Sequence, residues 1–183
     1  GRSPLNWSII LDRKRLVWNI FFIKPGMDDG DIIDYKKVDI TDWDTCKTLY
    51  YKVSISVKEL YLKNIPLIFS GTIKSKTQKG EVTFYHKRTP EDGKINWKKP
   101  VREIYNLIRA VTDPYPGAFT FIGPVKIFIW KAQPFDDNLI YDKAVCGEIV
   151  EVFNDNFIVT CVDGTLLVTE STYKTPYIKN IFN

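Results

Sequence analysis

The hydrophobic pattern of the chain changes at the segment Asp113-Pro114-Tyr115-Pro116-Gly117. Before this segment, apolar residues recur at three- and four-residue spacing over two stretches, which indicates amphipathic helices. After it, short apolar runs alternate with Gly, Pro, Asn and Asp, which indicates strands joined by tight turns. A chain of 183 residues can hold one large domain, or one domain with a small appendage. We therefore predict an α/β domain over residues 1–117 and a small all-β domain over residues 118–183.

The first domain is predicted to contain strands and two helices. The apolar run 16–23 predicts a largely buried strand, and the more polar run 31–40 predicts its partner. Thr41 is the predicted N-cap of the first helix, and Pro66 its predicted stop, because proline lacks the N–H donor. The helical stripes are Leu49, Tyr50, Val53, Val57, Leu60 and Tyr61, then Val101, Ile104, Leu107, Ile108 and Val111 in a second helix over 100–111. Residues 70–80 are predicted to be a loop, and 81–86 a short strand.

Five short strands are predicted in the second domain. They cover residues 118–122, 125–130, 147–153, 157–162 and 165–169. Turn residues separate them at 123–124, 154–156 and 163–164. The pair Asp163-Gly164 predicts a two-residue hairpin turn, because both positions of such a turn favour residues that tolerate positive φ.

Composition excludes several classes of protein. The net charge is +4, from 26 cationic and 22 anionic side chains, and the basic residues are scattered along the chain. A nucleic-acid partner is therefore not expected from charge alone. No apolar run approaches the roughly 20 residues that span a bilayer, so we expect no membrane partner. The three cysteines are far apart in sequence, which favours a reducing, cytoplasmic location.

The stretch PGMDDGDII, residues 25–33, brings three aspartates together around one glycine. Asp28, Asp29 and Asp31 do not have the spacing of a calcium-binding loop. They are open to interpretation as a polar turn, another carboxylate metal site, or a place where one carboxylate does chemistry. His86 is the sole histidine, so zinc sites of the Cys/His type are not indicated, and no metal is expected.

Three further residues have both a functional and a structural interpretation. Arg88 stands in the mixed-charge turn KRTPEDG, where its guanidinium could bind a carboxylate or a phosphate, or simply face solvent. Trp97 and Tyr115 flank the second predicted helix. Each could provide a stacking surface for a base, or pack in the core.

Several segments of the chain, in the same order, are similar to the folate-dependent formyltransferases. This family includes methionyl-tRNA formyltransferase and the nucleotide-sugar N-formyltransferases. The segments are GRSPLNW (1–7), GMDDGD (26–31), RTPEDGKINW (88–97), NLIRAVTDPYPGAF (106–119) and GEIVEVFNDNFIVTCVDGTLLV (147–168). The resemblance implies the C-terminal part of a Rossmann-like formyltransferase domain, followed by a small β-barrel-like (OB-like) module. Within the family, RTPEDG and AVTDPYPGAF resemble the sugar enzymes more closely than the tRNA enzymes.

The resemblance also implies a reaction and its residues. The formyl donor is N10-formyltetrahydrofolate, and the acceptor is the amino group of a dTDP- or UDP-linked 4-amino sugar. Asp28 matches the family's catalytic aspartate, with Asp29 and Asp31 as turn and surface residues. Arg2 is the candidate for contact with the donor, and Arg88, Trp97 and Tyr115 are the candidates for contact with the sugar nucleotide.

The family's catalytic asparagine and histidine lie in an N-x-H-x-S-L-L-P stretch that would precede Gly1, so we expect this chain to be a fragment. The sequence also departs from the family at Val17-Trp18-Asn19, where a G-V-T-like triplet is usual. The implied setting is surface polysaccharide synthesis, including lipopolysaccharide and O-antigen, with a homodimer as one option. The alternatives are a methionyl-tRNA formyltransferase and a truncated, non-catalytic binding module.

Overall fold

The structure is a computed structural model that describes residues 3–80, 83–139 and 141–183. The chain forms two compact units. The first unit comprises residues 1–8 and 13–87, and the second comprises residues 9–12 and 88–183. The short helix α1 (Pro4–Ile10) begins in the first unit. The predicted domain division between residues 117 and 118 stays a prediction.

The first unit is built on an antiparallel hairpin of β1 (Arg15–Phe21) and β2 (Ile32–Asp39). Both predicted strands are therefore confirmed. The predicted burial of the first strand is wrong, because Ile20 alone in β1 is buried. Each strand of this two-stranded sheet has a single neighbouring strand, and one helix packs on the sheet. Much of each strand therefore lies at the surface, even where its residues are apolar.

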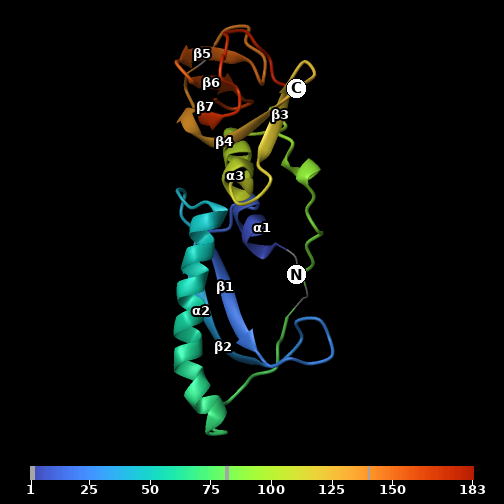
Figure 1. Cartoon of the computed structure of the whole chain (residues 1–183), viewed down its shortest axis with the longest axis vertical. Helices are drawn as coiled ribbons and strands as arrows, with labels where there is room; N and C mark the ends of the chain where they lie inside the picture. The colour runs from blue at the N-terminus through green and yellow to red at the C-terminus, as the bar shows by residue number, and fades with distance from the viewer. Residues whose placement is uncertain (1–2, 81–82, 140) are drawn as a thin grey trace. The chain divides into compact units, whose positions relative to one another are not determined.

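Helix α2 (Cys46–Phe69) covers this hairpin and follows its length (Figure 1). Its predicted N-cap at Thr41 is wrong. The helix begins one turn later at Thr45, whose side chain accepts a hydrogen bond from Thr48 N, while Thr48 Oγ1 accepts from Thr45 N. Thr41 instead forms a turn with Asp44, because both its N–H and its hydroxyl donate to the Asp44 carboxylate at 2.8 Å.

The predicted stop of this helix at Pro66 is also wrong. Pro66 lies inside α2, which continues to Phe69. Proline at this position removes the one helical hydrogen bond that its N–H would donate, and the turn that follows is held by hydrogen bonds from Ser70 N to Pro66 O and from Thr72 N to Leu67 O. Leu49, Val53 and Leu60 are buried as predicted. Tyr50 and Tyr61 are exposed instead, because they flank the buried face.

Two carboxylates hold the two ends of α2 in place. Near its start, buried Asp44 accepts hydrogen bonds from Thr41, Thr48 and Lys52. Near its end, Asp34 of β2 accepts from Lys63 Nζ and Asn64 Nδ2, both at 2.8 Å. Burial of Asp44 opposes its ionised form, but the hydrogen bonds together outweigh burial and lower its pKa.

The second unit places helix α3 (Val101–Val111) against a five-stranded antiparallel sheet. Its strands are β3 (Ala118–Ile122), β4 (Val125–Asp136), β5 (Ile149–Phe153), β6 (Asn156–Thr160) and β7 (Thr165–Ser171). The spatial order is β3-β4-β7-β6-β5 (Figure 1). Among the described residues no strand pairing joins β3 to β5, although backbone hydrogen bonds link residues 179–183 to Ile149 of β5 and to Phe121 of β3, so a closed OB-like barrel is not confirmed.

The predicted elements of this unit are close to those observed. All five strands are present, and β4 runs six residues further than predicted, to Asp136. Cys161 N donates to Gly164 O, so the tight turn contains Val162-Asp163, one residue earlier than predicted. Asp163 instead caps α3, because its Oδ1 accepts from Val101 N at 2.7 Å. Residues 83–86 form no strand, and residues 81 and 82 lie outside the described residues.

The core of the second unit includes an aromatic cluster. The rings of Trp97 and Phe182 stack with centroids 5.4 Å apart, and Phe157 packs against Phe182. Trp97 is 4% exposed, and its Nε1–H donates to Thr120 Oγ1 at 3.0 Å. No helix within the described ranges is long and apolar enough to cross a lipid bilayer.

We predict that Asp44→Ala lowers the free energy of unfolding by about 1–3 kcal/mol, because several donors lose their buried acceptor. The lowered pKa also makes this contribution depend on pH. It is present above the ordinary aspartate value of about 3.9 and is lost as pH falls through the lower folded-state pKa. Urea unfolding at several pH values tests this. Asp42→Ala, which removes an exposed carboxylate, is the control, and an equal loss in both variants contradicts the prediction.

We predict that Trp97→Ala lowers the free energy of unfolding by about 3–5 kcal/mol, because it empties a buried aromatic site. Trp97→Phe retains the stack on Phe182 and should cost less. The matched control is Trp43→Ala, since Trp43 is 79% exposed and its loss should stay within about 0.5 kcal/mol. Urea midpoints measure all three, and similar losses at residues 97 and 43 would refute the core role.

Candidate functional site

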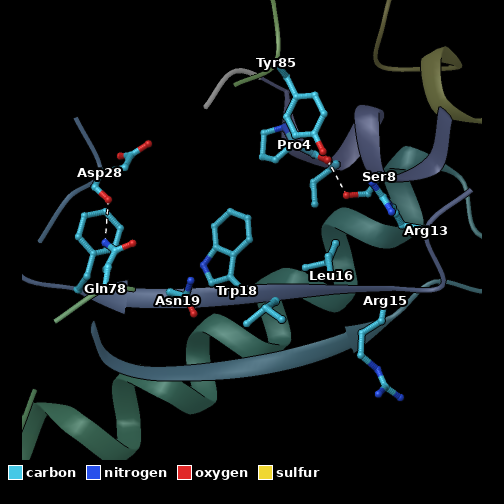
Figure 2. A pocket seen from close by; sticks show the side chains of 13 residues that line it. Pro4, Ser8, Arg13, Arg15, Leu16, Trp18, Asn19, Asp28, Gln78 and Tyr85 are labelled. Carbon is cyan, nitrogen blue, oxygen red and sulfur yellow. Dashed lines mark hydrogen bonds between the residues drawn. The ribbon is translucent and has the colours of Figure 1, made fainter. Parts of the chain in front are cut away.

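A groove with a volume of about 640 Å³ opens on the first unit (Figure 2). Side chains from α1, β1, the loop after β1, and the segment before residue 87 surround it. The lining residues are Pro4, Leu5, Ser8, Arg13, Arg15, Leu16, Val17, Trp18, Asn19, Phe21, Asp28, Gln78 and Tyr85. The groove is therefore assembled from parts of the chain up to 81 positions apart in sequence.

The apolar part of the groove comes from β1 and Tyr85. Figure 2 shows the indole of Trp18 pointing from β1 into the groove. Tyr85 is held on the α1 side, because its ring stacks on Trp7 with centroids 5.6 Å apart. Trp7 also contacts the His86 ring edge-on at 4.8 Å and donates its indole N–H to His86 O. These contacts attach the 85–86 segment to α1 and give the groove an aromatic wall.

Asp28 lies in the loop between β1 and β2 and lines the groove. Its φ of 55° is in the left-handed region. The loop closes where Gly30 meets Phe22, since a Cβ on Gly30 would lie 1.5 Å from Phe22 O. A hydrogen bond from Phe22 N to Asp31 O, 3.1 Å long, completes the closure. Glycine is thus required at position 30, and Asp28 stands at a fixed place in a closed loop.

The three aspartates of this loop have different surroundings. The Asp31 carboxylate pairs with Lys24 Nζ at 3.0 Å, and hydrogen bonding from Lys24 lowers its pKa. Asp29 is exposed, and its carboxylate lies over the backbone of Gly26. The backbone around Asp28 is held by Gln78, whose Nε2 donates to Asp28 O at 2.8 Å and to Gly30 O at 2.7 Å. Of the three, Asp28 is the aspartate that borders the groove.

The other predicted site residues lie in the second unit or outside the described residues. Arg2 is outside the described residues. Arg88 is half-buried and donates from Nη2 to Asp92 O at 2.7 Å. Burial lowers its pKa, although nearby Asp92 acts in the opposite direction. Tyr115 stands in the turn after α3 and is 36% exposed.

Trp97, predicted to contact substrate, is placed in the core of the second unit, where its indole N–H is already used by Thr120. It also borders a hollow of about 980 Å³, together with Lys94, Lys98 and Phe182. Neither Arg88 nor Tyr115 lines this hollow. Within the described part of the chain, no three His, Cys, Asp or Glu side chains gather as metal ligands would.

Sequence reasoning missed Gln78, Trp18 and Tyr85 as site residues. Trp18 had one signal, since it stands in the triplet that departs from the family pattern. Gln78 had none, because it lies in a polar segment assigned as loop and binds carbonyls 48 and 50 positions away. Such a contact is set by the tertiary fold and has no local sequence pattern.

Solved structures similar to this chain include three enzymes with different names. HypX from Aquifex aeolicus, solved with tetrahydrofolic acid, is 20% identical and has a TM-score of 0.75 over 93% of this chain and 29% of HypX. An N-formyltransferase from Helicobacter canadensis, solved with folinic acid and dTDP-3-aminofucose, is 24% identical, with a TM-score of 0.74 over 93% of this chain and 61% of that protein. Methionyl-tRNA formyltransferase from Clostridium thermocellum is 25% identical, with a TM-score of 0.62 over 77% of this chain and 60% of that protein.

These similarities establish the fold, and the chain spans between about 29% and 61% of the length of these proteins. Residues 87–181, more than half of the chain, match the family described as "Formyl transferase, C-terminal domain". This match covers the short 3-10 helix η1 (Pro90–Gly93), α3 and the five-stranded sheet. It agrees with the sequence segments that first suggested the resemblance, from RTPEDGKINW onward. The chain therefore belongs to the formyltransferase family.

Proposed function

We propose that the protein containing this chain transfers a formyl group from N10-formyltetrahydrofolate to the amino group of a nucleotide-linked amino sugar. The observation that carries the proposal is the family match over residues 87–181, combined with an aspartate, Asp28, at the groove of the first unit. The sugar as acceptor is supported by likeness over 93% of the chain to the Helicobacter canadensis enzyme, whose structure contains dTDP-3-aminofucose. A second sugar 3N-formyltransferase, WlaRD, is similar over 96% of the chain.

The proposed reaction is a substitution at the formyl carbon. The amine nitrogen of the sugar forms a bond to that carbon, and the bond from the carbon to N10 of the folate breaks. The amine loses a proton, N10 gains one, and the products are a formamide and tetrahydrofolate. A carboxylate close to the amine can assist the proton transfers, and general acid–base assistance of this kind contributes about 10²–10⁴-fold to a rate. We assign this role to Asp28.

The groove has features that suit the folate donor. Folates carry a flat heteroaromatic ring, and the aromatic side chains of Trp18 and Tyr85 offer surfaces on which such a ring can stack. Arg13 at the groove could meet an anionic group of the donor. A volume of about 640 Å³ is in the range of small-molecule sites. The proposed place of the donor ring is therefore beside β1, and Arg2 remains a proposed donor contact.

The acceptor contacts are proposed in the second unit. Arg88 carries a guanidinium that can bind a phosphate, and Tyr115 offers a partly exposed ring. Trp97 keeps its proposed place near the acceptor through the hollow that it borders. We further propose a cytoplasmic enzyme of surface polysaccharide synthesis, including lipopolysaccharide and O-antigen. A Rossmann-like catalytic domain, an OB-like C-terminal module and a homodimer remain parts of this proposal.

The activity is tested with the intact protein. We expect it to convert a dTDP- or UDP-linked amino sugar to the formamide in the presence of N10-formyltetrahydrofolate, as detected by mass spectrometry. The acceptors tested include both 3-amino and 4-amino sugars. The two similar sugar enzymes are named with a 3-amino sugar or as a sugar 3N-formyltransferase, whereas the sequence resemblance implied a 4-amino sugar. Formylation of initiator methionyl-tRNA instead would contradict the sugar acceptor. Absence of any formylation in the intact protein would favour a non-catalytic binding module.

The role of Asp28 is tested by Asp28→Asn, which keeps the size of the side chain and removes its charge. We expect kcat to fall by about 10²–10⁴-fold, since proton transfer loses its carboxylate. Asp29→Asn is the matched control, because Asp29 is an exposed neighbour in the same loop and should have near-normal activity. Circular dichroism and thermal midpoints check that both variants fold. Near-normal turnover of Asp28→Asn would refute the assignment.

A further inference from the structure

We propose that Gln78 is a positioning residue that fixes the Asp28 loop for catalysis. The inference rests on the proposed function, because it takes Asp28 to be the residue that Gln78 positions. Gln78 donates from Nε2 to Asp28 O at 2.8 Å (Figure 2). The same Nε2 donates to Gly30 O at 2.7 Å. It lies 50 and 48 residues from these partners, so the contact joins two distant parts of the first unit.

The two bonds require a side chain with at least two N–H donors, which the glutamine amide supplies. Nε2 of glutamine carries two hydrogens, and here each can serve one carbonyl oxygen. The opposite orientation of the amide would set its oxygen against two other oxygens, so the contacts determine which end faces the loop. A carboxylate at this position would repel both carbonyls, and an aliphatic side chain would leave them without this donor. Gln78 is thus suited to hold the peptide group that follows Asp28 and the one that follows Gly30.

The loop needs such support because its backbone is strained at Asp28, the residue that it presents to the groove. Asp28 has a φ of 55°, a region that residues with a side chain seldom adopt. The loop is exposed from residue 22 to residue 29, so few packing contacts hold it. Its base is closed by Phe22 and Gly30, but Asp28 lies beyond that closure. The hydrogen bond from Gln78 to Asp28 O holds the loop beyond the closure, and its bond to Gly30 O links that contact to the closed base.

Gln78 is itself fixed by the strand that follows the Asp28 loop. Two residues earlier, Lys76 forms an antiparallel bridge with Ile32, the first residue of β2. Both of its hydrogen bonds, Ile32 N to Lys76 O and Lys76 N to Ile32 O, are 2.8 Å long. The segment around Gln78 is therefore registered against the same strand that ends the loop. The backbone bridge at Lys76 and the two hydrogen bonds from Gln78 together fix the position of Asp28.

A residue that acts through Asp28 should affect turnover more than binding. Small misplacements of a catalytic group reduce rate strongly, by as much as about 10²-fold for 1 Å. Gln78→Met keeps the length of the side chain and removes both donors. We expect kcat to fall by about tenfold or more, with KM for each substrate changed by less than about twofold. The thermal midpoint should not move, since the bonds are exposed or half-buried.

A second readout does not depend on activity. Hydrogen exchange measured on peptides that cover residues 22–32 should become faster in Gln78→Met, because the loop opens more often. Peptides from β4 should be unchanged. Gln133→Met is the matched control, since Gln133 is exposed on β4 in the second unit and should alter neither kcat nor exchange of the loop.

The outcomes separate this inference from the proposed function. If Asp28→Asn is inactive but Gln78→Met has normal kcat or normal loop exchange, the positioning role is overturned and the proposed function stands. A fall in kcat accompanied by a lowered thermal midpoint would also overturn it, as a general loss of structure. If Asp28→Asn is fully active, both proposals fail. Selective loss of kcat with faster loop exchange in Gln78→Met alone supports the positioning role.

Discussion

The packing of α2 on the β1–β2 hairpin is the contact on which the groove depends. A two-stranded sheet is marginally stable in water by itself, because neither face is covered. Leu49, Val53 and Leu60 of the helix supply that cover, and Ile20 and Val38 are buried on the strands. Every groove residue contributed by β1, and the loop that carries Asp28, is thus supported by a helix that does not itself line the groove.

The aspartates of the first unit have different roles. Some of them form ion pairs that support the structure, whereas Asp28 is the one to which we assign a role in the proposed reaction. Asp44 and Asp34 each receive a lysine and further hydrogen bonds, and for both the pKa is lowered. They stay ionised. Asp34 ties the end of α2 to β2, and Asp44 ties the start of α2 to Thr41, in the turn that follows β2. Asp31 likewise pairs with Lys24. Asp28 differs in that it borders the groove, and Gln78 holds its backbone carbonyl.

The sequence predicted most elements because local patterns determine them. The alternation of turns and apolar runs after Gly117 gave all five strands, and the stripe from Val101 to Val111 gave α3. The errors arose where two local signals competed. Thr41 and Thr45 are both capable N-caps, and Asp44 decides between them by binding Thr41. Pro66 carries a strong stop signal, but it removes a single helical hydrogen bond, and the turn after it is closed by hydrogen bonds from Ser70 N and Thr72 N.

The site was predictable only in part, for a related reason. Asp28 could be identified because it lies in a short motif, GMDDGD, which can be recognised in a single sequence. Gln78 and the stacking of Tyr85 on Trp7 depend on segments that meet after folding. No spacing rule connects positions 28 and 78. Trp97 shows a different difficulty. A residue beside a helix end can lie in the core or at the surface, and the sequence left both interpretations open. Its stacking on Phe182 places it in an aromatic cluster.

The contact between Gly30 and Phe22 has a consequence for how this loop can change over time. Because backbone meets backbone there, the number of residues between the two strands is tied to the place where they close. Adding or deleting one residue between positions 22 and 30 would shift Asp28 along the loop and rotate it away from the groove. Exposed side chains such as Met27 and Asp29 can therefore vary at little structural cost, whereas a change in loop length would alter the closure itself.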